Sequence, residues 1–263
     1  MEDSQCSAAA SVPRTVQSVA RAAQLLKALG RLTRPASLSE LARKVGLSKP
    51  TAYNLLKTLE SEGLISKSSD AKYTLDWGLY ELGATVATSV ELARVSRFHL
   101  DRLAEITGEA ALLGILDGES VLYLDRGQGS DAFSMVANVG RRSALHSTAS
   151  GKILLANRES DFIQAFLKRK LKAFTSKTIT DPAQLRAELT TAARRGYAIC
   201  WEEQEIGLSS ISVPLRDGSG LVQAAMTIAA PSNRLNGTTL SHYLVALQTE
   251  ASGAEKRLAI RSR

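Results

Sequence analysis

Two short helices in tandem constrain the fold of this chain more than any other feature of its sequence. Ser37 and Glu40 stand three residues apart, as in a capping box, and the apolar face that follows ends at Gly46. Ser48 is then placed to cap a second helix, with Pro50 tolerated in its first turn, where the amide needs no intrahelical partner. Two capped helices joined by a glycine turn are typical of a helix-turn-helix.

A further helix is predicted before this pair, and a small hairpin after it. Apolar residues recur at helical spacing from Ser18, which can cap the start, to Gly30, which can close the end. Residues 64–75 are predicted to form a strand, a turn and a second strand. Three helices and a hairpin indicate a winged helix-turn-helix over residues 14–78, preceded by a flexible tail at 1–13.

The third helix of this domain, which runs to about Glu62, has one apolar and one polar side. At about 100° per residue, its three leucines and Ala52 cluster together. We expect that side to be buried and the other to enter the major groove of DNA, where Asn suits adenine and Lys suits phosphate or guanine. The candidate DNA contacts are Ser48, Lys49, Pro50, Thr51, Tyr53, Asn54 and Lys57.

The distribution of charge is compatible with binding to a polyanion. The 263-residue chain carries a net charge of +7, and residues 1–78 contain eleven Lys and Arg against seven Asp and Glu. A net +4 in under a third of the chain permits DNA binding without proving it. The alternative is that the trihelical domain mediates protein contacts.

The rest of the chain mixes helical and strand patterns. A helix over residues 79–95, apolar and poor in charge, is predicted to link two domains or to pair two subunits. Beyond it we expect helices near 97–107, 149–157, 159–169, 182–195 and from 238, and strands at 110–117, 120–125, 132–139, 208–215 and 221–230. This order indicates an α+β domain over residues 96–263.

Composition argues against several classes of protein. Only Cys6 and Cys200 are present, so neither a disulfide framework nor a paired-cysteine metal site is expected, and a reducing, cytoplasmic setting is favoured. No apolar run approaches the roughly 18 residues that a membrane span needs, and the acidic, polar start does not have the form of an export signal. We therefore expect no membrane partner.

Several ordered motifs resemble the IclR family of bacterial transcription regulators. In the N-terminal part they are VQSVARAAQLLKAL, LSELARKVGLSKPTAYNLLKTLESEGLI and YTLDWGLYELG. In the C-terminal part they are LHSTASGKILLA, RRGYAICWEEQEIGLSSISVPLRDGSG and VQAAMTIAAP. The resemblance implies a GAF-like C-terminal domain that binds a small organic acid, a homodimer or homotetramer, and a palindromic DNA operator. GLSSISVPLRD is most similar to the branch that senses aromatic acids.

The same resemblance implies a set of effector contacts. A helix opening at 147–150 also presents backbone N–H groups that suit a carboxylate, and alternation puts Ser210 with Ser212 on one strand face. Cys200 and Trp201 stand where acidic residues are frequent, which favours a ring or an alkyl chain, and Phe133, Met135 and Tyr197 could add wall surface. The implied contacts are Thr148, Ala149, Ser150, Cys200, Ser210, Thr227 and Ala229.

Enzymatic interpretations find little support in the sequence. The glycine-containing stretch 127–132 is followed by a strand-like run instead of the helix that a dinucleotide site requires, and His146 beside Ser147 lacks a nucleophile elbow. The three histidines are scattered without ligand spacing. We expect no catalytic residue, no metal and no cofactor. A metabolic enzyme with an N-terminal oligomerisation module is the alternative function.

Overall fold

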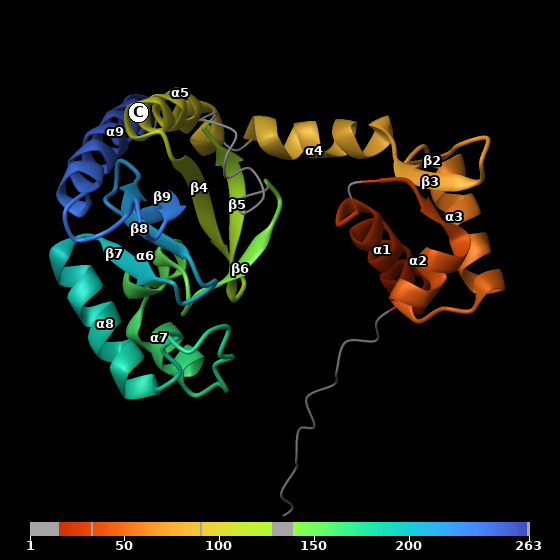
Figure 1. Ribbon diagram of the computed structural model, residues 1–263. Coiled ribbons are helices and arrows are strands. Elements are labelled where there is room, and N and C mark those ends of the chain that lie inside the picture. The colour runs from red at the N-terminus through yellow and green to blue at the C-terminus, as the bar shows by residue number, and fades with distance from the viewer. Residues whose placement is uncertain (1–15, 33, 90, 128–138, 262–263) are drawn as a thin grey trace, which may run out of the picture. The chain divides into compact units, whose positions relative to one another are not determined.

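The computed structural model describes residues 16–32, 34–89, 91–127 and 139–261, and the chain divides into two compact units. The first ends at Ser89 and the second begins at Val90 (Figure 1). Each unit is described by itself. The strand expected at 132–139, with Phe133 and Met135, lies almost wholly outside the described residues.

The first unit packs helices on a small antiparallel sheet of strand order β1-β3-β2. Its core holds Leu25, Leu41, Leu56, Ile65 and Tyr73, each at most 2% exposed. The helices are α1 (Gln17–Gly30), α2 (Leu38–Val45), α3 (Lys49–Ser61) and α4 (Trp77–Ser89), and the strands are β1 (Ala36–Ser37), β2 (Ile65–Lys67) and β3 (Lys72–Leu75).

The caps of α2 and α3 are those that the sequence predicts. The Ser37 hydroxyl accepts from the Glu40 amide at 3.3 Å, and Gly46 ends α2 at a φ of 70°, which an L side chain rarely adopts. The Ser48 hydroxyl accepts from the Thr51 amide, also at 3.3 Å. Local hydrogen bonding alone therefore determines where these helices begin and end.

The predicted start of α1 is wrong by two residues and its predicted end by one. The N-cap is Val16, without a side-chain cap, in place of Ser18, and Arg31 follows Gly30 as the C-cap. The buried side chains of Leu25 and Leu29 position this helix. Their burial outweighs a cap that stabilises a helix by only about 1 kcal/mol.

The segment expected to form one linker helix over 79–95 contains parts of two helices. The first, α4, ends at Ser89, and α5 (Glu91–Thr107) follows in the second unit. Val95 and Leu100, in the first turns of α5, belong to the core of that unit. Packing of these side chains explains why residues 91–95 join the second unit.

The second unit is built on a six-stranded antiparallel sheet of order β6-β5-β4-β9-β8-β7. Two strands that the sequence did not predict, β6 and β7, form its edges. They are three and four residues long, too short for a period to show. The strands are β4 (Ala110–Asp117), β5 (Ser120–Arg126), β6 (Arg142–Ala144), β7 (Ala198–Trp201), β8 (Leu208–Arg216) and β9 (Val222–Pro231).

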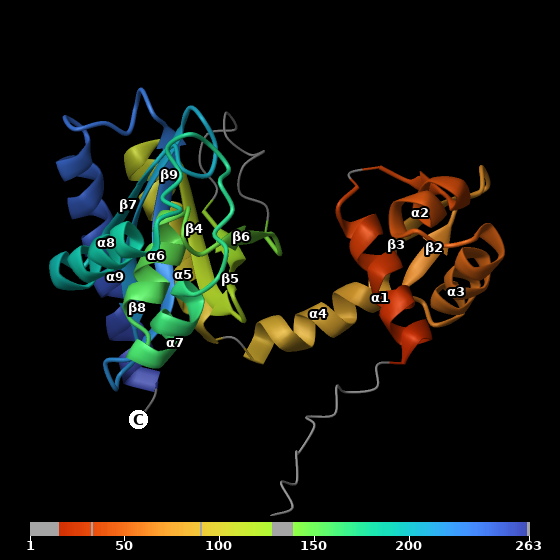
Figure 2. The ribbon, with the colours of Figure 1, turned by 90° about the horizontal axis from the view of Figure 1, so that it is seen from below.

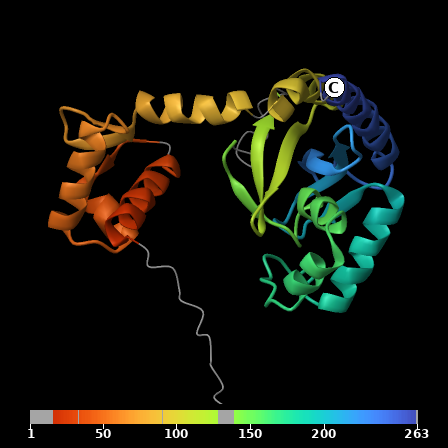
Figure 3. The same cartoon turned by 180° about the vertical axis from the view of Figure 1, so that it is seen from behind.

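Helices cover both faces of this sheet (Figures 2 and 3). Alternate residues of β9 point to opposite faces: Met226 and Ile228 pack with α5 and α9, whereas Ala225 and Ala229 belong to the core of α6 and α8. The remaining helices are α6 (Ala149–Ala156), α7 (Ser160–Leu167), α8 (Pro182–Arg195) and α9 (Leu240–Arg261). No helix in the described ranges is both long and apolar enough to cross a membrane.

Candidate functional sites

One side of α3 is buried and the other is exposed, as the sequence predicts. Ala52 and Leu56 are fully buried, whereas Tyr53 is 44% exposed. The exposed face of α3 consists of Lys49, Pro50, Tyr53, Asn54 and Lys57, with exposed Ser48 before it and half-buried Thr51 at its edge. A polar helix face without a covering element in its own unit has the form of a recognition helix.

The same unit carries basic side chains outside α3, and the two in the hairpin of β2 and β3 have protein contacts. Arg43 and Lys44 are exposed in the last turn of α2. Lys67 lies over the Tyr73 ring at 5.7 Å, and Lys72 forms an exposed ion pair with Asp70 at 2.7 Å. Exposed ion pairs are weak, so Lys72 can exchange Asp70 for a phosphate at small cost.

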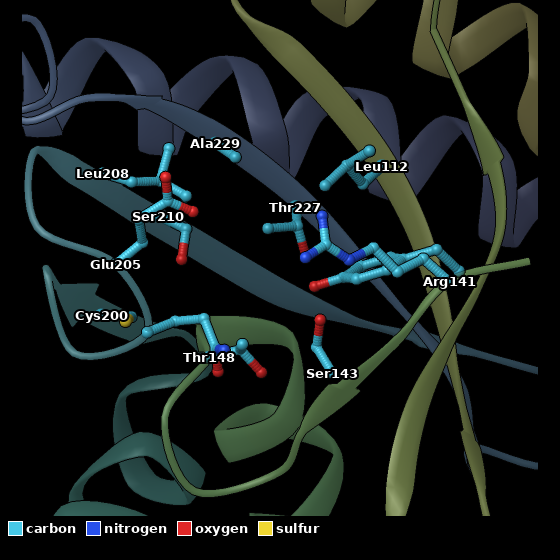
Figure 4. A pocket seen from close by; sticks show the side chains of 12 residues that line it. Leu112, Arg141, Ser143, Thr148, Cys200, Glu205, Leu208, Ser210, Thr227 and Ala229 are labelled. Carbon is cyan, nitrogen blue, oxygen red and sulfur yellow. The ribbon is translucent and has the colours of Figure 1, made fainter. Parts of the chain in front are cut away.

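A pocket of about 590 Å³, including its open mouth, lies in the second unit on the face of the sheet that α6 covers (Figure 4). Its wall contains five of the seven residues that the resemblance implied: Thr148, Cys200, Ser210, Thr227 and Ala229. The other two, Ala149 and Ser150, are fully buried and do not line it.

Sheet register brings the lining residues together. Cys200 of β7 pairs with Ser210 of β8, which pairs in turn with Ala229 of β9, while Thr227 pairs with Leu112 of β4. Sequence reasoning missed more than half of the wall because it did not predict the strand order. The missed residues are Leu112, Tyr123, Arg141, Ser143, Gln204, Glu205 and Leu208.

Two aromatic residues that the sequence suggested for the wall lie elsewhere. Trp201 is 39% exposed and is neither core nor part of the lining. Tyr197 packs under the guanidinium of Arg195, 4.5 Å from its ring centroid. The aromatic side chain that does line the pocket among the described residues is Tyr123. Burial raises the pKa of its phenol, against opposing hydrogen bonding from Ser150 and Ser143.

A row of hydroxyl groups runs from the pocket into the sheet. The Tyr123 hydroxyl lies 3.3 Å from the Ser150 hydroxyl, which is 2.8 Å from that of Thr227. Thr227 is 2.8 Å from the Ser212 hydroxyl, which donates to the Met226 carbonyl at 3.0 Å. Ser150, which does not itself line the pocket, therefore connects Tyr123 and Thr227, which do.

Two further lining side chains, Cys200 and Thr148, donate to backbone carbonyls. The Cys200 thiol donates to the Ser147 carbonyl at 3.0 Å, and burial, more than the nearby Glu203, raises its pKa to about 11. The Thr148 hydroxyl donates to the Ala144 carbonyl at 2.8 Å. At neutral pH the thiol is thus a protonated, apolar part of the wall and not a nucleophile.

A buried ion pair joins α6 to the segment that follows β7. Lys152 of α6, 1% exposed, contacts a carboxylate oxygen of Glu203, 5% exposed. The second carboxylate oxygen of Glu203 has no hydrogen-bond partner among the residues that the structure describes. One residue earlier, a side chain at Gly151 would come within 2.3 Å of the Leu145 carbonyl, so α6 can pack this closely only with glycine there.

Two of the three histidines bond to neighbouring groups through a ring nitrogen. His146 bonds through Nε2 to the Lys172 carbonyl at 2.9 Å and lies beside Phe166 and Phe174. His99 bonds to Glu250 at 2.7 Å between α5 and α9. Within the described part of the chain, no three His, Cys, Asp or Glu side chains form a group that could hold a metal ion.

Comparison with known proteins gives the same domain order. The model of the IclR helix-turn-helix domain matches residues 18–69, and that of the bacterial transcriptional regulator IclR C-terminal domain matches residues 84–254. The chain is similar to the HTH-type transcriptional regulator KdgR of Escherichia coli, with 35% identity over 241 residues and 91% of each chain covered.

Two solved structures have the same fold. The Thermotoga maritima IclR matches with a TM-score of 0.77 and 30% identity, covering 93% of this chain and 99% of that one. An IclR homolog from Microbacterium hydrocarbonoxydans, complexed with 4-hydroxybenzoate, matches with a TM-score of 0.83 and 27% identity, covering 94% and 100%. These similarities extend over both units of the chain.

Proposed function

Because the chain belongs to the IclR family of bacterial transcriptional regulators, we propose that it is a ligand-controlled regulator whose pocket binds a small organic carboxylate. The observation that carries this proposal is the pocket in a unit separate from the exposed face of α3. The related proteins are transcriptional regulators and not enzymes, so the alternative of a metabolic enzyme is set aside.

For DNA, we assign distinct roles to the residues of α3. Asn54 is proposed to read a base edge, since its carboxamide can both donate to and accept from adenine. Lys49 and Lys57 are proposed to contact phosphates or guanine, and Tyr53 to contact the DNA with its exposed ring. Ser48, Pro50 and Thr51 shape the N-terminus of the helix, where backbone amides attract phosphate.

For the effector, the proposal is a carboxylate that carries a ring or an alkyl chain. Leu112, Leu208 and Ala229 give the pocket apolar wall, and Arg141 gives it a cation. The 4-hydroxybenzoate in the solved homolog supports an aromatic acid, at 27% sequence identity. The proposed direct contacts are Thr148, Cys200, Ser210 and Thr227. Ala149 and Ser150 are fully buried, and they are proposed to act on the ligand only through the residues that line the pocket.

Self-association through α4 is part of the same proposal. This helix exposes three large apolar side chains, Trp77 at 74%, Tyr80 at 68% and Leu82 at 59%. Exposed apolar side chains on a charge-poor helix are suited to contact with a second copy, and a two-fold dimer reads a palindromic operator. The effector then acts by binding with different affinities to two conformations of the dimer, which differ in how the two α3 helices are arranged.

The test uses the full chain. Random duplexes are selected for binding, and the enriched sequence is titrated at several salt concentrations with and without a panel of carboxylates. We expect a palindrome, an affinity that falls steeply with salt, and a carboxylate that changes it. An affinity for DNA that is absent, or insensitive to salt, would contradict the DNA-binding role.

A single variant tests the pocket. Ser210→Trp fills the space above β8 and should abolish the effector response while DNA affinity stays within a few fold. The matched control is Val245→Trp on α9, a position that is 63% exposed and does not line the pocket. An unchanged effector titration in Ser210→Trp would remove Ser210 from the site.

A further inference from the structure

The positive charge of this chain is gathered in two places, and one of them is far from α3 in the sequence. The net charge of +7 includes +4 from residues 1–78 and +5 from residues 168–177, so the rest of the chain is net negative. Residues 168–177, here called the basic segment, contain five Lys and Arg and no Asp or Glu. The basic segment lies between α7 and α8 in the second unit (Figure 1). The roles assigned to the exposed face of α3 and to the pocket do not involve it.

Every cation of the basic segment is exposed, and two of the five have an acidic partner. The five are Lys168, Arg169, Lys170, Lys172 and Lys177. Arg169 forms an ion pair with Glu119, and Lys177 forms one with Glu202. Their side chains are still 51% and 56% exposed, and exposed pairs of this kind are weak. In the described part of the second unit, no ion pair joins the other three cations to a carboxylate.

Contacts on its inner side fix the backbone of the basic segment. Leu171 packs against the core of α6 and α8, and the Lys172 carbonyl accepts a hydrogen bond from His146 Nε2 at 2.9 Å. The hydroxyls of Thr175 and Thr178 donate to two carbonyls of the turn between β7 and β8, at 2.8 and 2.6 Å. A partner therefore meets cations on a backbone that is already held in place, so binding costs little backbone entropy.

So much charge of one sign is unfavourable for the folded unit. Like charges this close together repel one another, and a surface that serves solubility alone mixes both signs. Lys168 and Lys170 make no ion pair within the described residues that would offset this repulsion. Natural proteins depart from such rules where function requires it. The basic segment is therefore suited to an anionic partner.

The open arrangement of these cations suits an extended polyanion better than a small anion. None of the five lines the pocket of the second unit. DNA is the polyanion that the proposed function brings to this chain. Because both units belong to one chain, the second has an effective concentration of about 1 mM near a duplex bound by α3. A contact with a dissociation constant of about 0.1 mM would then strengthen binding about tenfold.

We infer that the basic segment contacts the phosphates of DNA that flanks the operator. Lys168 and Lys170 are the principal contacts, and Arg169 and Lys177 can exchange their acidic partners for phosphates at small cost. The inference rests on the proposed function, because α3 must first place the chain on its operator. It adds a contact in the second unit that gives affinity for DNA without reading its sequence.

The first experiment compares two duplexes on the full chain. The short duplex contains only the palindrome enriched by selection, and the long one adds about two helical turns, roughly 20 base pairs, of random sequence at each end. The wild-type chain should bind the long duplex about tenfold more tightly. In Lys168→Gln/Lys170→Gln this advantage should disappear, while affinity for the short duplex stays the same. The salt slope on the long duplex should fall by about 0.9 for each phosphate contact that is lost.

The matched control removes the same charge from other surfaces of the second unit. Arg194 in the last turn of α8 and Lys256 on α9 are both exposed. Arg194→Gln/Lys256→Gln should keep the advantage of the long duplex, and an equal loss in both double variants would show an effect of net charge alone and overturn the assignment. Urea unfolding should find Lys168→Gln/Lys170→Gln at least as stable as the wild type, because the substitutions relieve repulsion.

The second experiment needs no variant, so it does not depend on how a substitution affects folding. Acetylation of the wild-type chain, followed by mass spectrometry, reports which lysines a bound molecule protects. The long duplex should slow acetylation of Lys168 and Lys170 severalfold. The short duplex should protect Lys57 of α3 and neither of these two. Lys256 is the reference that neither duplex protects.

The outcomes separate this inference from the proposed function. If the wild-type chain binds the short duplex and gains nothing from the long one, the inference is wrong and the DNA-binding role of α3 stands. If it binds neither duplex, both fail. Protection of Lys168 and Lys170 by polyglutamate, and not by the long duplex, would assign the basic segment to an acidic protein and overturn its contact with DNA.

Discussion

The two candidate sites of this protein are built in opposite ways. The exposed face of α3 belongs to one helix, and its residues follow one another within nine positions from Lys49 to Lys57. The pocket takes its wall from positions between Leu112 and Ala229, brought together by strands that are far apart in the chain. The first site depends on local hydrogen bonds, and the second depends on register across a whole sheet.

This difference also appears in the electrostatics. The charged pair nearest the start of α2, Arg34 with Glu40, joins an exposed side chain to a half-buried one. The pair behind the pocket, Lys152 with Glu203, is almost fully buried, and one carboxylate oxygen has no partner in the described structure. The pocket should therefore be far more sensitive to substitution than the exposed face of α3, and the following variants test this difference.

The largest effect is expected from breaking the buried pair. Lys152→Met leaves the Glu203 carboxylate uncompensated and should destabilise the second unit by ~3–5 kcal/mol. Each unit has one tryptophan, Trp77 or Trp201, so a Trp77→Phe background lets fluorescence follow the second unit alone during denaturation.

Two controls accompany that variant. Adding Glu203→Leu to Lys152→Met removes the orphaned charge and should recover most of the loss. Arg34→Met, in the first unit, breaks the more exposed pair and should leave unfolding unchanged within error. Equal sensitivity of the two pairs would contradict the comparison.

A smaller effect is expected from Cys200 at high pH. Its folded pKa of about 11 exceeds the ordinary 9.0, so the folded protein holds the thiol proton more tightly than the unfolded chain does. Stability from this group is complete below about pH 9 and is lost as pH rises toward 11, by up to about 3 kcal/mol.

Cys200→Ser keeps the donor to the Ser147 carbonyl and removes the titration. Urea titrations of both proteins between pH 7 and 11 should give curves of stability against pH that diverge above pH 9. Parallel curves would mean that the thiol is not protected by burial.

On the exposed face of α3, effects should be in DNA binding and not in folding. Asn54→Ala should cost ~1–3 kcal/mol at one base position of the operator and relax the preference there. Lys57→Ala should weaken all sequences alike and reduce the salt slope by about one. An Asn54→Ala loss that is equal for every base would make Asn54 a backbone contact.

The smallest effect is expected at Ser48, where two variants separate its role as the cap of α3 from its role in DNA binding. Ser48→Ala removes the acceptor for the Thr51 amide and should cost about 1 kcal/mol of stability. Ser48→Asp keeps a cap, so stability should be retained, while its negative charge should repel phosphate and weaken DNA binding. If both variants change stability and DNA affinity in parallel, Ser48 acts through folding alone.

The helix-turn-helix could be predicted from local sequence, because Ser37, Gly46 and Ser48 act on their own neighbours within three or four residues. It also predicted which side of α3 is buried, since helical periodicity is a local property. The resemblance to the family motifs identified five of the residues that line the pocket.

Which side chains meet at the pocket depends on packing between segments that are distant in the chain. Tyr123, Arg141 and Ser143 lie outside the motifs that resemble the family, and their place in the wall follows from a strand order that periodicity does not encode. The row of hydroxyl groups likewise forms only where three strands and a helix pack together. A local pattern can specify a helix face, whereas a cavity exists only once distant segments have packed around it.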